Sequence, residues 1–532
     1  MTEIRQWEPI TPIEIITSRK SAYNMKILFF TPVAAYPIHV GVLLDEMTKF
    51  AKNGHEIIYV YNNCCYDFCS ANMCADTAIC KLCKYDMQHM LNLVPPNVLK
   101  VNLSEFWNND TKIQFQYNNV QELKKIEYKG VKTGYSVLST YINATRNLAP
   151  LIDETSKKYF DALFLRSVKL TDAFEKVLDT YKPDRVCFYN ARLLEQRPEY
   201  DLSRNQGIET YSYEVYAGWN EPFYKTKFIN STPHNLTTLH DRYRALWDNV
   251  RMPESEKEKV GRVFFEKKRA GIAIGDKVYV KNQTKGKIPL DWDTKKHNIV
   301  IFNSSEDEFS ALGDEFDKLA LFPSQYQGIT FIANALKENP DMHIWLRIHP
   351  NLTHIPYRYH QDLHKLSTTY PNLSVIAGSD DVSSYDLMDA ADKVVVFGST
   401  IGLESAYHKK AVILLAGSIY YYSDICYVPR SKEELKQLLM TTNLPAKDNS
   451  EAIKIGFYYA YRNPNDMYEY IDFNKENIKF FNREWKDVYH YLKLFDSYKL
   501  YTIVKRVRYK LFYKKNRITL EIPTEENLKA DL

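Results

Sequence analysis

Short continuous apolar runs alternate along this chain with longer segments in which apolar residues recur every three or four positions. Near the start, residues 25–30 and 55–60 are apolar runs of strand length. Between them, residues 39–53 have the periodicity of an amphipathic helix that ends at Asn53 and Gly54. The pattern predicts a β-α-β unit, and therefore parallel strands joined by a right-handed crossover.

The same alternation continues through both halves of the chain. In the first half, strands are predicted at 162–165, 185–188 and 209–212, with helices around 138–158 and 168–181. In the second half, the predicted strands are 297–302, 343–348, 373–376, 393–397 and 411–415, and the helices are 323–338, 357–369, 384–390 and 401–408. Strands that alternate with helices are typical of α/β proteins. The sequence therefore predicts an α/β fold with two Rossmann-like, doubly wound domains.

The expected domain boundaries follow from shifts in this pattern. Residues 1–24 read as an N-terminal extension and 25–245 as the first domain, which includes a Cys-rich insertion at 62–85. Residues 246–290 are charged and poor in apolar runs, so we interpret them as a linker with a helix near 253–270. The second domain is expected at 291–465, followed by C-terminal helices over 466–532. Two such domains would place a ligand cleft between them.

Composition excludes several classes of protein. The chain has 532 residues, of which 45% are hydrophobic and 26% charged, as in ordinary globular proteins. A net charge of +4 is too small to indicate a nucleic-acid partner. No apolar run is long enough to cross a bilayer, and the first 24 residues lack the basic-then-apolar order of a signal peptide. We therefore expect a cytoplasmic protein.

Polar, turn-forming residues follow the predicted strands of the second half. Because open α/β sheets bind ligands at the carboxyl ends of their strands, His349 and the segment 398–404 are expected at one edge of the sheet. Two helices would begin there, and a helix amino terminus with nearby hydroxyls favours phosphate. Read singly, a Ser-Thr pair is also an ordinary helix cap and a His-Pro pair an ordinary turn. The predicted donor-binding residues are Asn303, Ser304, Arg347, Ser383, Ser384, Gly398, Ser399, Thr400, Gly402 and Glu404.

These motifs resemble a known family. Residues 394–416, with the order strand, Gly-Ser-Thr-Ile-Gly-Leu-Glu-Ser-Ala, strand, resemble the donor-binding half of GT-B glycosyltransferases. The pairs His349-Pro350 and Ser383-Ser384 are similar to motifs of bacterial sialyl-, polysialyl- and Kdo-transferases. The resemblance covers roughly residues 25–465 and implies transfer of a sugar to a glycan or lipid-linked acceptor in surface polysaccharide synthesis. It favours a CMP-sugar donor, with UDP- and GDP-sugars as alternatives.

The resemblance also implies roles for individual residues. His349 would contact the leaving phosphate, while Ser384, Ser399 and Thr400 would hold phosphate oxygens. Glu404 is predicted to accept hydrogen bonds from a ribose. Catalysis would need no metal, because GT-B enzymes require no Asp-x-Asp and none lies in a suitable loop after a strand.

The catalytic base is expected in the first half. The similar sialyltransferases carry an acidic-acidic-Gly triplet, which residues 25–245 lack. Glu214 is our first candidate because it follows a predicted strand, although a solvated loop carboxylate would look the same. The alternatives are His39 at the start of the first helix and the adjacent acids Asp45 and Glu46 within it. Asn190 and Arg192, which leave another strand end, are predicted to bind acceptor.

Cysteines cluster in the insertion. Six of the eight fall within twenty residues: Cys64, Cys65, Cys69, Cys74, Cys80 and Cys83. In a cytoplasmic protein such a cluster indicates metal binding before disulfides. Four thiolates would form a closed structural zinc site, and an iron–sulfur cluster would use the same ligands; free buried thiols are the alternative. The predicted ligands are Cys65, Cys69, Cys80 and Cys83.

Near the C-terminus, residues 497–517 contain eight Lys or Arg and no acid, with apolar residues at helical spacing. This pattern predicts a basic amphipathic helix on an anionic membrane surface; a closing helix packed on the protein body would show the same pattern.

Two other functions fit the fold. A nucleotide-sugar 2-epimerase would need catalytic carboxylates at the sugar and would act on the nucleotide sugar alone. A non-catalytic glycan-binding scaffold would bind no nucleotide.

Overall fold

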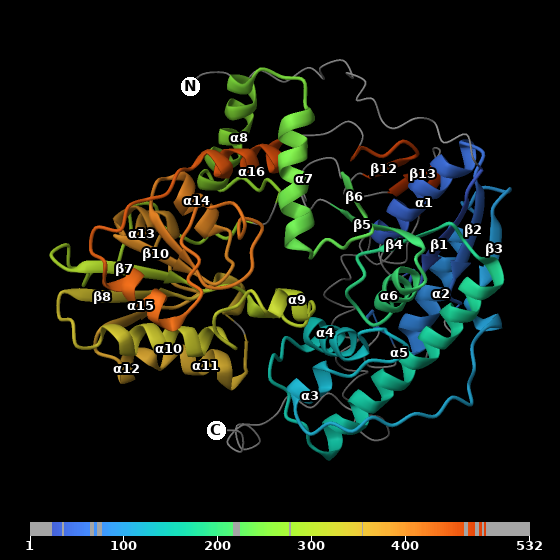
Figure 1. Ribbon diagram of the computed structural model, residues 1–532, viewed down its shortest axis with the longest axis horizontal. Helices are drawn as coiled ribbons and strands as arrows, with labels where there is room; N and C mark the ends of the chain where they lie inside the picture. Colours follow the sequence, from blue (N-terminus) through green and yellow to red (C-terminus); the bar gives the residue numbers. More distant parts are fainter. Residues whose placement is uncertain are drawn as a thin grey trace.

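Two sheets, each covered by helices, form the body of the molecule, and Figure 1 shows them as units placed side by side. The computed structural model describes residues 24–34, 37–63, 69–71, 77–215, 224–275, 278–353, 355–461, 466–473, 478–480 and 483–485. We call the first sheet with helices α1–α6 the first unit, and the second sheet with helices α7–α16 the second unit. The predicted α/β class with Rossmann-like units is confirmed.

The first unit contains a six-stranded sheet in the order β3-β2-β1-β4-β5-β6. Its strands pair in parallel except β6, which runs antiparallel to β5. The strands are β1 (Lys26–Thr31), β2 (Glu56–Tyr61), β3 (Leu99–Asn102), β4 (Arg185–Tyr189), β5 (Glu209–Val215) and β6 (Lys225–Ile229). The helices are α1 (Pro37–Lys52), α2 (Thr77–Leu91), η1 (Leu103–Glu105), α3 (Val120–Lys124), α4 (Thr133–Thr145), α5 (Glu154–Tyr181) and α6 (Arg197–Asn205).

The second unit contains a parallel five-stranded sheet in the order β11-β10-β7-β8-β9. The strands are β7 (His297–Phe302), β8 (Met342–Arg347), β9 (Leu373–Ile376), β10 (Lys393–Val396) and β11 (Ala411–Leu414). The helices before the sheet and up to β8 are α7 (Leu236–Asn249), α8 (Glu254–Arg269), η2 (Glu306–Glu308), α9 (Asp314–Asp317) and α10 (Gln325–Leu336). The later helices are η3 (Pro350–Leu352), α11 (Arg358–His364), α12 (Leu366–Thr369), α13 (Ser384–Ala390), α14 (Ile401–Tyr407), α15 (Lys432–Met440) and α16 (Ser450–Ala460).

Both faces of the second sheet are buried, which explains its continuous apolar strands. Along β7, Ile299 and Ile301 pack in the core that includes α10 and α15. Val300 and Phe302 point to the opposite face, where the core includes α8, α13, α14 and α16. Each fully buried aliphatic side chain of this kind contributes about 1.5–3 kcal/mol. Alternation between two apolar faces is the property expected of a parallel sheet.

The strand predicted at 162–165 is wrong, because these residues lie inside α5. Asp153 and Ser156 form a capping box that starts this helix, and Leu163 and Phe164 belong to its buried side. A short apolar run cannot be distinguished from one face of a buried helix by periodicity alone. The helix predicted at 138–158 is in turn interrupted, since α4 ends at Thr145 and Arg146 adopts a left-handed backbone with φ 61°.

The predicted linker contributes a packed helix to the second unit. Helix α8 lies against α16, and the closest approach is between two glycines. A Cβ atom on Gly261 would lie 2.4 Å from the carbonyl oxygen of Ile453, and one on Gly456 would lie 2.4 Å from that of Gly261. Phe264 and Phe265 of α8 join the core of the second sheet.

After α16 the chain returns to the first unit, where β12 (Ile471–Phe473) lies near α1 (Figure 1). Glu469 pairs with Lys49 of α1, and Ile471 packs in the core of the first sheet. Two further short strands, β13 (Ile478–Phe480) and β14 (Arg483–Trp485), complete an antiparallel sheet. Strands therefore replace the predicted helices in this part of 466–532.

The predicted basic segment 497–517 lies outside the described residues, as does the predicted extension apart from Asn24. Among the described helices, none combines the length and the apolar character needed to span a membrane.

Candidate functional site

Three neighbouring strands of the second sheet deliver polar loops to one edge. Strand β7 lies between β10 and β8 and pairs in parallel with both. Asn303 therefore leaves the centre of this edge, with His349 on one side and Gly398 on the other. The segments predicted to converge do lie at the same carboxyl edge.

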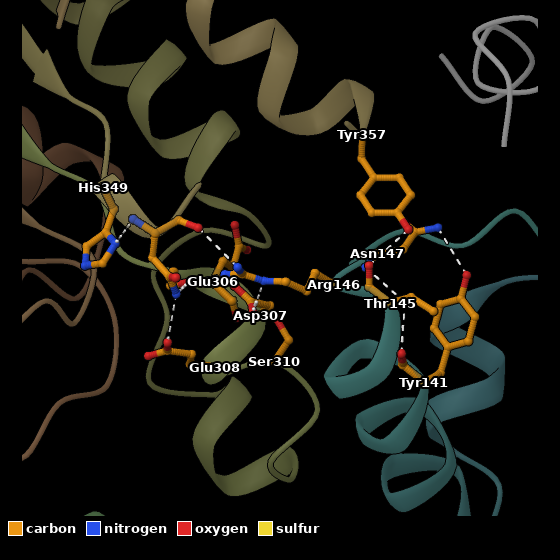
Figure 2. A network of polar contacts seen from close by, with 12 residues as sticks. Tyr141, Thr145, Arg146, Asn147, Glu306, Asp307, Glu308, Ser310, His349 and Tyr357 are labelled. Atoms are coloured by element: carbon orange, nitrogen blue, oxygen red, sulfur yellow. Dashed lines mark hydrogen bonds and ion pairs between the residues drawn. The ribbon is translucent and has the colours of Figure 1, made fainter. Parts of the chain in front are cut away.

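His349 is oriented by hydrogen bonds on its backbone and its ring, and Figure 2 shows the bond on the ring. Its backbone N–H donates to Asn303 Oδ1 over 2.7 Å, and its Nδ1 accepts from the backbone N–H of Asn351 over 3.1 Å. The ring also meets the edge of Tyr279, with centroids 4.8 Å apart. Because Nδ1 is an acceptor, the neutral ring carries its proton on Nε2. The outer nitrogen of His349 is thus a hydrogen-bond donor.

The loop that follows β10 is closely packed on its backbone side and carries unbonded hydroxyls. Gly398 has φ +89°, and a Cβ atom there would lie 2.6 Å from the carbonyl oxygen of Gly417. The Tyr420 hydroxyl donates to the carbonyl of Ser399 and fixes the next turn. The half-buried Ser399 and Thr400 hydroxyls make no hydrogen bond to any residue that the structure describes. Both remain available as donors to a ligand.

The two serines at the start of α13 differ in their surroundings. Ser383 caps this helix by accepting from the backbone N–H of Asp386 over 3.2 Å. Ser384 is held through its backbone N–H, which donates 2.8 Å to Gln283 Oε1. Within the described part of the chain, the Ser384 hydroxyl is unbonded, so this residue keeps a donor and Ser383 serves as a cap.

Two predicted donor-binding residues instead build the wall of the site. The buried Ser304 hydroxyl donates to the carbonyl of Phe397 over 2.9 Å and holds the ends of β7 and β10 together. The buried Arg347 guanidinium donates to the carbonyls of Ala377 and Asp380, which shapes the loop after β9. Burial lowers the pKa of Arg347. These contacts give both side chains a structural role in the wall of the site, and their predicted contact with the donor stays a prediction.

Glu404 and Gly402 also have internal partners. The carboxylate of Glu404 is 4% exposed and accepts from the Tyr385 hydroxyl, so it is not open to a ribose as predicted. Gly402 is required for packing, because a Cβ atom there would lie 2.4 Å from the Tyr420 hydroxyl oxygen.

The corresponding edge of the first sheet carries a compact polar cluster. Glu214, at the end of β5, accepts from the Tyr189 hydroxyl, from Asn190 Nδ2 and from the backbone N–H of Val215. Burial raises the pKa of Glu214. His234 Nε2 lies 3.2 Å from Asn190 Oδ1 and extends the cluster. Burial, followed by two nearby arginines, lowers the pKa of His234 to about 3.

His39 lies beside this cluster on α1. Its ring stacks on Tyr189 with centroids 3.8 Å apart and an interplanar angle of 12°. Burial lowers the pKa of His39 to about 4, so the imidazole is neutral near pH 7. A small pocket at this position is lined by His39, Tyr189, Thr31, Ser70 and Glu195, among others.

The predicted acceptor-binding role of Arg192 is not what its contacts indicate. Its Nη1 and Nη2 donate to the carbonyls of Asp307, Glu308 and Ser310 in the second unit, at 3.1–3.3 Å. Its Nε donates to Ser139 Oγ over 2.6 Å. Burial lowers its pKa to about 10. Arg192 therefore joins the two units, while Asn190 stays at the edge of the first sheet.

The two acids of α1 are not available as a catalytic base. Lys225 of β6 is 4% exposed, pairs with Asp45, and lies 2.6 Å from Glu46. Asp45 also accepts from the backbone N–H groups of Glu469 and Tyr470. This buried group of charges ties the returning C-terminal segment to the first unit.

The predicted metal site is only partly visible. Cys69, Cys80 and Cys83 are not joined in disulfides, and Cys65 lies outside the described residues. Among the residues that are described, no three His, Cys, Asp or Glu side chains converge as metal ligands. Burial raises the pKa of Cys69, which opposes the thiolate form that a metal needs. The four-cysteine site, with zinc or an iron–sulfur cluster, stays a prediction.

Several residues around the site had no signal in the sequence. Asn351, which orients His349, follows a His-Pro pair that reads as a plain turn. His234 and Tyr279 are single aromatic residues in segments without a motif. Arg146 is an unremarkable basic residue after a helix, and its partners lie 159–205 positions away.

Comparison with known proteins gives one match at the family level. Residues 318–433 match the model of a family described as capsule polysaccharide biosynthesis protein. This segment contains His349, Ser384 and the 398–404 loop, whereas the first unit lies outside it. A comparison with curated proteins found no match.

Comparison with solved structures gives distant likenesses. A Thermosulfurimonas dismutans KpsC beta Kdo 2,4 transferase is 14% identical over 52% of this chain and 78% of its own, with a TM-score of 0.32. The UDP-GlcNAc 2-epimerase of Neisseria meningitidis is 13% identical over 81% and 98%, with a TM-score of 0.26. The Streptomyces nogalater glycosyltransferase SnogD is 10% identical over 82% and 96%, with a TM-score of 0.20.

Proposed function

We propose that this chain is a glycosyltransferase that moves a sugar from a nucleotide-sugar donor to a glycan or lipid-linked acceptor in capsule or related surface polysaccharide synthesis. One observation carries the proposal. His349 and several hydroxyls that bond to no described residue lie at the carboxyl edge of the second sheet, inside the segment that matches the capsule polysaccharide family. Ligands of open α/β sheets bind at this edge.

The donor diphosphate or phosphate would be held by the second unit. The Nε2–H of His349 would donate to the leaving phosphate, and the hydroxyls of Ser384, Ser399 and Thr400 would bind its oxygens. Gly398 would let the backbone approach the ligand closely. We favour a CMP-sugar, with UDP- and GDP-sugars as the alternatives.

The acceptor would be activated from the first unit. Glu214 suits a general base, because burial raises its pKa above the ordinary value of a carboxyl group and so makes it a stronger proton acceptor. The neutral imidazole of His39 is the second candidate. Asn190, which binds Glu214, would contact the acceptor.

We further propose that transfer needs no catalytic metal. The pair Asp291 and Asp293 precedes β7, at the amino end of the strand and away from the site, so it does not supply an Asp-x-Asp at the ligand edge. Location in the cytoplasm and contact with an anionic membrane surface remain predictions from the sequence.

The direct test is the thermal unfolding midpoint of the purified chain with CMP, UDP, GDP and their sugars. A ligand that binds only the folded state raises the midpoint. At a concentration one hundred times its Kd, it adds about 2.7 kcal/mol to the free energy of unfolding. The double variant Ser399→Ala/Thr400→Val should lose most of the shift. Thr180→Val, which removes an exposed hydroxyl from α5, is the matched control and should keep it.

A turnover assay separates the functions that share this fold. His349→Ala should lower the transfer rate by about 10²–10⁴-fold, the contribution usual for a positioned proton donor, without changing the fold. Consumption of the nucleotide sugar without acceptor, yielding its epimer, would indicate an epimerase. The absence of any nucleotide-induced shift would overturn the proposal in favour of a scaffold.

A further inference from the structure

Arg146 reaches from the first unit into the loops that support His349 (Figure 2). It follows α4 and takes a left-handed backbone, with φ 61°. Its Nε and Nη2 bind the two carboxylate oxygens of Asp307 at 2.8 and 3.1 Å. The same guanidinium donates to Ser305 Oγ over 2.8 Å and to the carbonyl of Asn351 over 3.1 Å. One side chain thus fixes three residues of the other unit.

The three partners of Arg146 are also bound to each other. Ser305 Oγ donates to Asp307 Oδ1 over 2.7 Å and accepts from Asn351 Nδ2 over 3.1 Å. With the donation from Arg146, the Ser305 hydroxyl has a full set of partners. Asn351 is therefore held through its carbonyl and its side chain, and its backbone N–H occupies Nδ1 of His349.

The backbone before Arg146 is fixed from the second unit as well. The Tyr359 hydroxyl donates to the Arg146 carbonyl over 2.7 Å, and the Tyr357 hydroxyl donates to the carbonyl of Thr145 over 3.0 Å. At the end of α4, two backbone carbonyls therefore accept hydrogen bonds from the second unit, and the Arg146 guanidinium donates hydrogen bonds to that unit. This arrangement exists only while the two units are in contact.

We propose that Arg146 is a positioning residue for the donor site: contact between the units, made through Arg146, fixes Asn351 and so holds His349 with Nδ1 occupied and the proton on Nε2. The inference rests on the proposed function for its meaning in catalysis, because it assigns to the first unit control over the proton donor of the second. Separation of the units would remove the Arg146 donor from the Asn351 carbonyl and leave Asn351 with its partners Ser305 and Glu308 in the second unit, so Nδ1 of His349 would be held less firmly.

Two other contacts between the units involve neither Asn351 nor His349. Arg192 binds the backbone carbonyls of residues 307, 308 and 310 in the second unit. The pair Lys124–Asp317, at 2.7 Å, lies at α9, away from Asn351. Lys124 therefore offers a matched control: its removal breaks an ion pair between the units and leaves the support of His349 in place.

The test that needs no ligand is modification of His349 by diethylpyrocarbonate, followed by mass spectrometry of the peptide. The imidazole nitrogen that carries the lone pair attacks a carbonyl carbon of the reagent, and in His349 this nitrogen is the Nδ1 engaged by Asn351. Arg146→Ala should raise the modification rate of His349 by roughly 2- to 10-fold, the range that loss of one hydrogen bond gives. Lys124→Ala should leave the rate at His349 unchanged. His408, which follows the last residue of α14, is an internal reference, and its modification rate should be the same in all variants. Equal rates at His349 in Arg146→Ala and wild type would overturn the inference.

The second measurement compares each nucleotide (CMP, UDP or GDP) with its nucleoside. Arg146→Ala should weaken binding of the nucleotide and spare the nucleoside, since only the phosphate meets His349; Lys124→Ala should change neither. Arg146→Lys keeps the charge at Asp307 but has no planar fork for Asn351 and Ser305, so it should fall between wild type and Arg146→Ala. It also serves as the test variant if circular dichroism shows that Arg146→Ala does not fold.

The two measurements separate the two proposals. A wild-type chain that binds no nucleotide contradicts the proposed function, while the modification rates still decide whether Arg146 positions His349. A wild-type chain that binds nucleotide, with Arg146→Ala indistinguishable from Lys124→Ala in both measurements, contradicts the positioning role alone.

Discussion

The two sheets end in edges of opposite character. At the first edge, charged and aromatic side chains satisfy one another, as Glu214 does with Tyr189 and Asn190. At the second edge, the backbone is closely packed and the hydroxyls of Ser399 and Thr400 bond to no described residue. Under the proposed function this difference would divide the work between the edges: the second would bind the anionic donor, and the first holds a titratable group, Glu214, whose burial raises its pKa.

The largest effect is expected where the first unit buries its charges. Lys225→Met leaves Asp45 and Glu46 without their cation in a site that is almost fully buried. Loss of one partner of a buried ion pair costs about 3–5 kcal/mol. We expect a drop of that size in the free energy of unfolding, measured by urea denaturation. It would show that the buried ion pairs of Lys225 stabilise the first unit.

Lys49→Met is the control for Lys225→Met. It breaks the pair with Glu469, which joins α1 to the C-terminal segment and is more than one-third exposed on each partner, whereas the buried pairs of Lys225 join β6 to α1. Exposed pairs contribute about 0–1 kcal/mol. Similar losses in the two variants would mean that attachment of the C-terminal segment, and not the buried charge, determines the effect.

A smaller effect is expected at the glycine of the second edge. Gly398→Ala meets two penalties: a left-handed backbone and a Cβ atom 2.6 Å from the carbonyl oxygen of Gly417. Strain of this kind costs about 1–3 kcal/mol, and we expect a loss of unfolding free energy in that range together with weaker nucleotide binding.

Gly54→Ala is the control that separates the cost of the left-handed backbone from the cost of the steric contact with Gly417. Gly54 has a similar φ of +86°, but nothing lies within 4 Å of a Cβ atom there. It should lose only the cost of the backbone conformation, about 1–2 kcal/mol, and bind nucleotide as the wild type does. Equal losses of unfolding free energy in the two variants would mean that the close packing of Gly398 against Gly417 does not contribute to the stability of the second edge.

Sequence reasoning worked where a single segment carries all the information. The strands of the second sheet were placed within a residue or two, because each is a buried apolar run bounded by polar residues. The same rule failed at 162–165, where an apolar run forms one face of a long helix. Burial on both sides gives strands and buried helices the same local pattern, so the pattern alone does not separate them.

The site was predictable in position but not in its internal contacts. That His349 and Gly398 meet at one edge follows from strand topology. That Arg347 and Glu404 turn into the wall, or that Arg146 reaches Asn351 from 205 positions away, depends on tertiary packing of another segment. A basic residue after a helix carries no sign of its partner in the sequence, so such contacts could only be found in the structure.

The smallest effect, and the sharpest test of the comparison, concerns the proton of Glu214. Burial raises its folded-state pKa, so between its ordinary value near 4.5 and the raised value the folded state binds more protons than the unfolded state. The free energy of unfolding therefore falls as pH rises through this window. Glu214→Gln removes the titration, so the stability of wild type minus variant should fall with rising pH above about 4.5. Urea denaturation at a series of pH values measures this difference.

Glu154→Gln should show the opposite sign. The Glu154 carboxylate is exposed and bonds to Lys158, which lowers its pKa. The folded state then releases its proton more readily than the unfolded state, so this contribution is lost as pH falls below the ordinary value. The two pH profiles should therefore slope in opposite directions. A flat profile for Glu214→Gln would mean that its hydrogen bonds fully offset burial, and that the first edge does not hold a base poised by its environment. The search for the base would then move to His39.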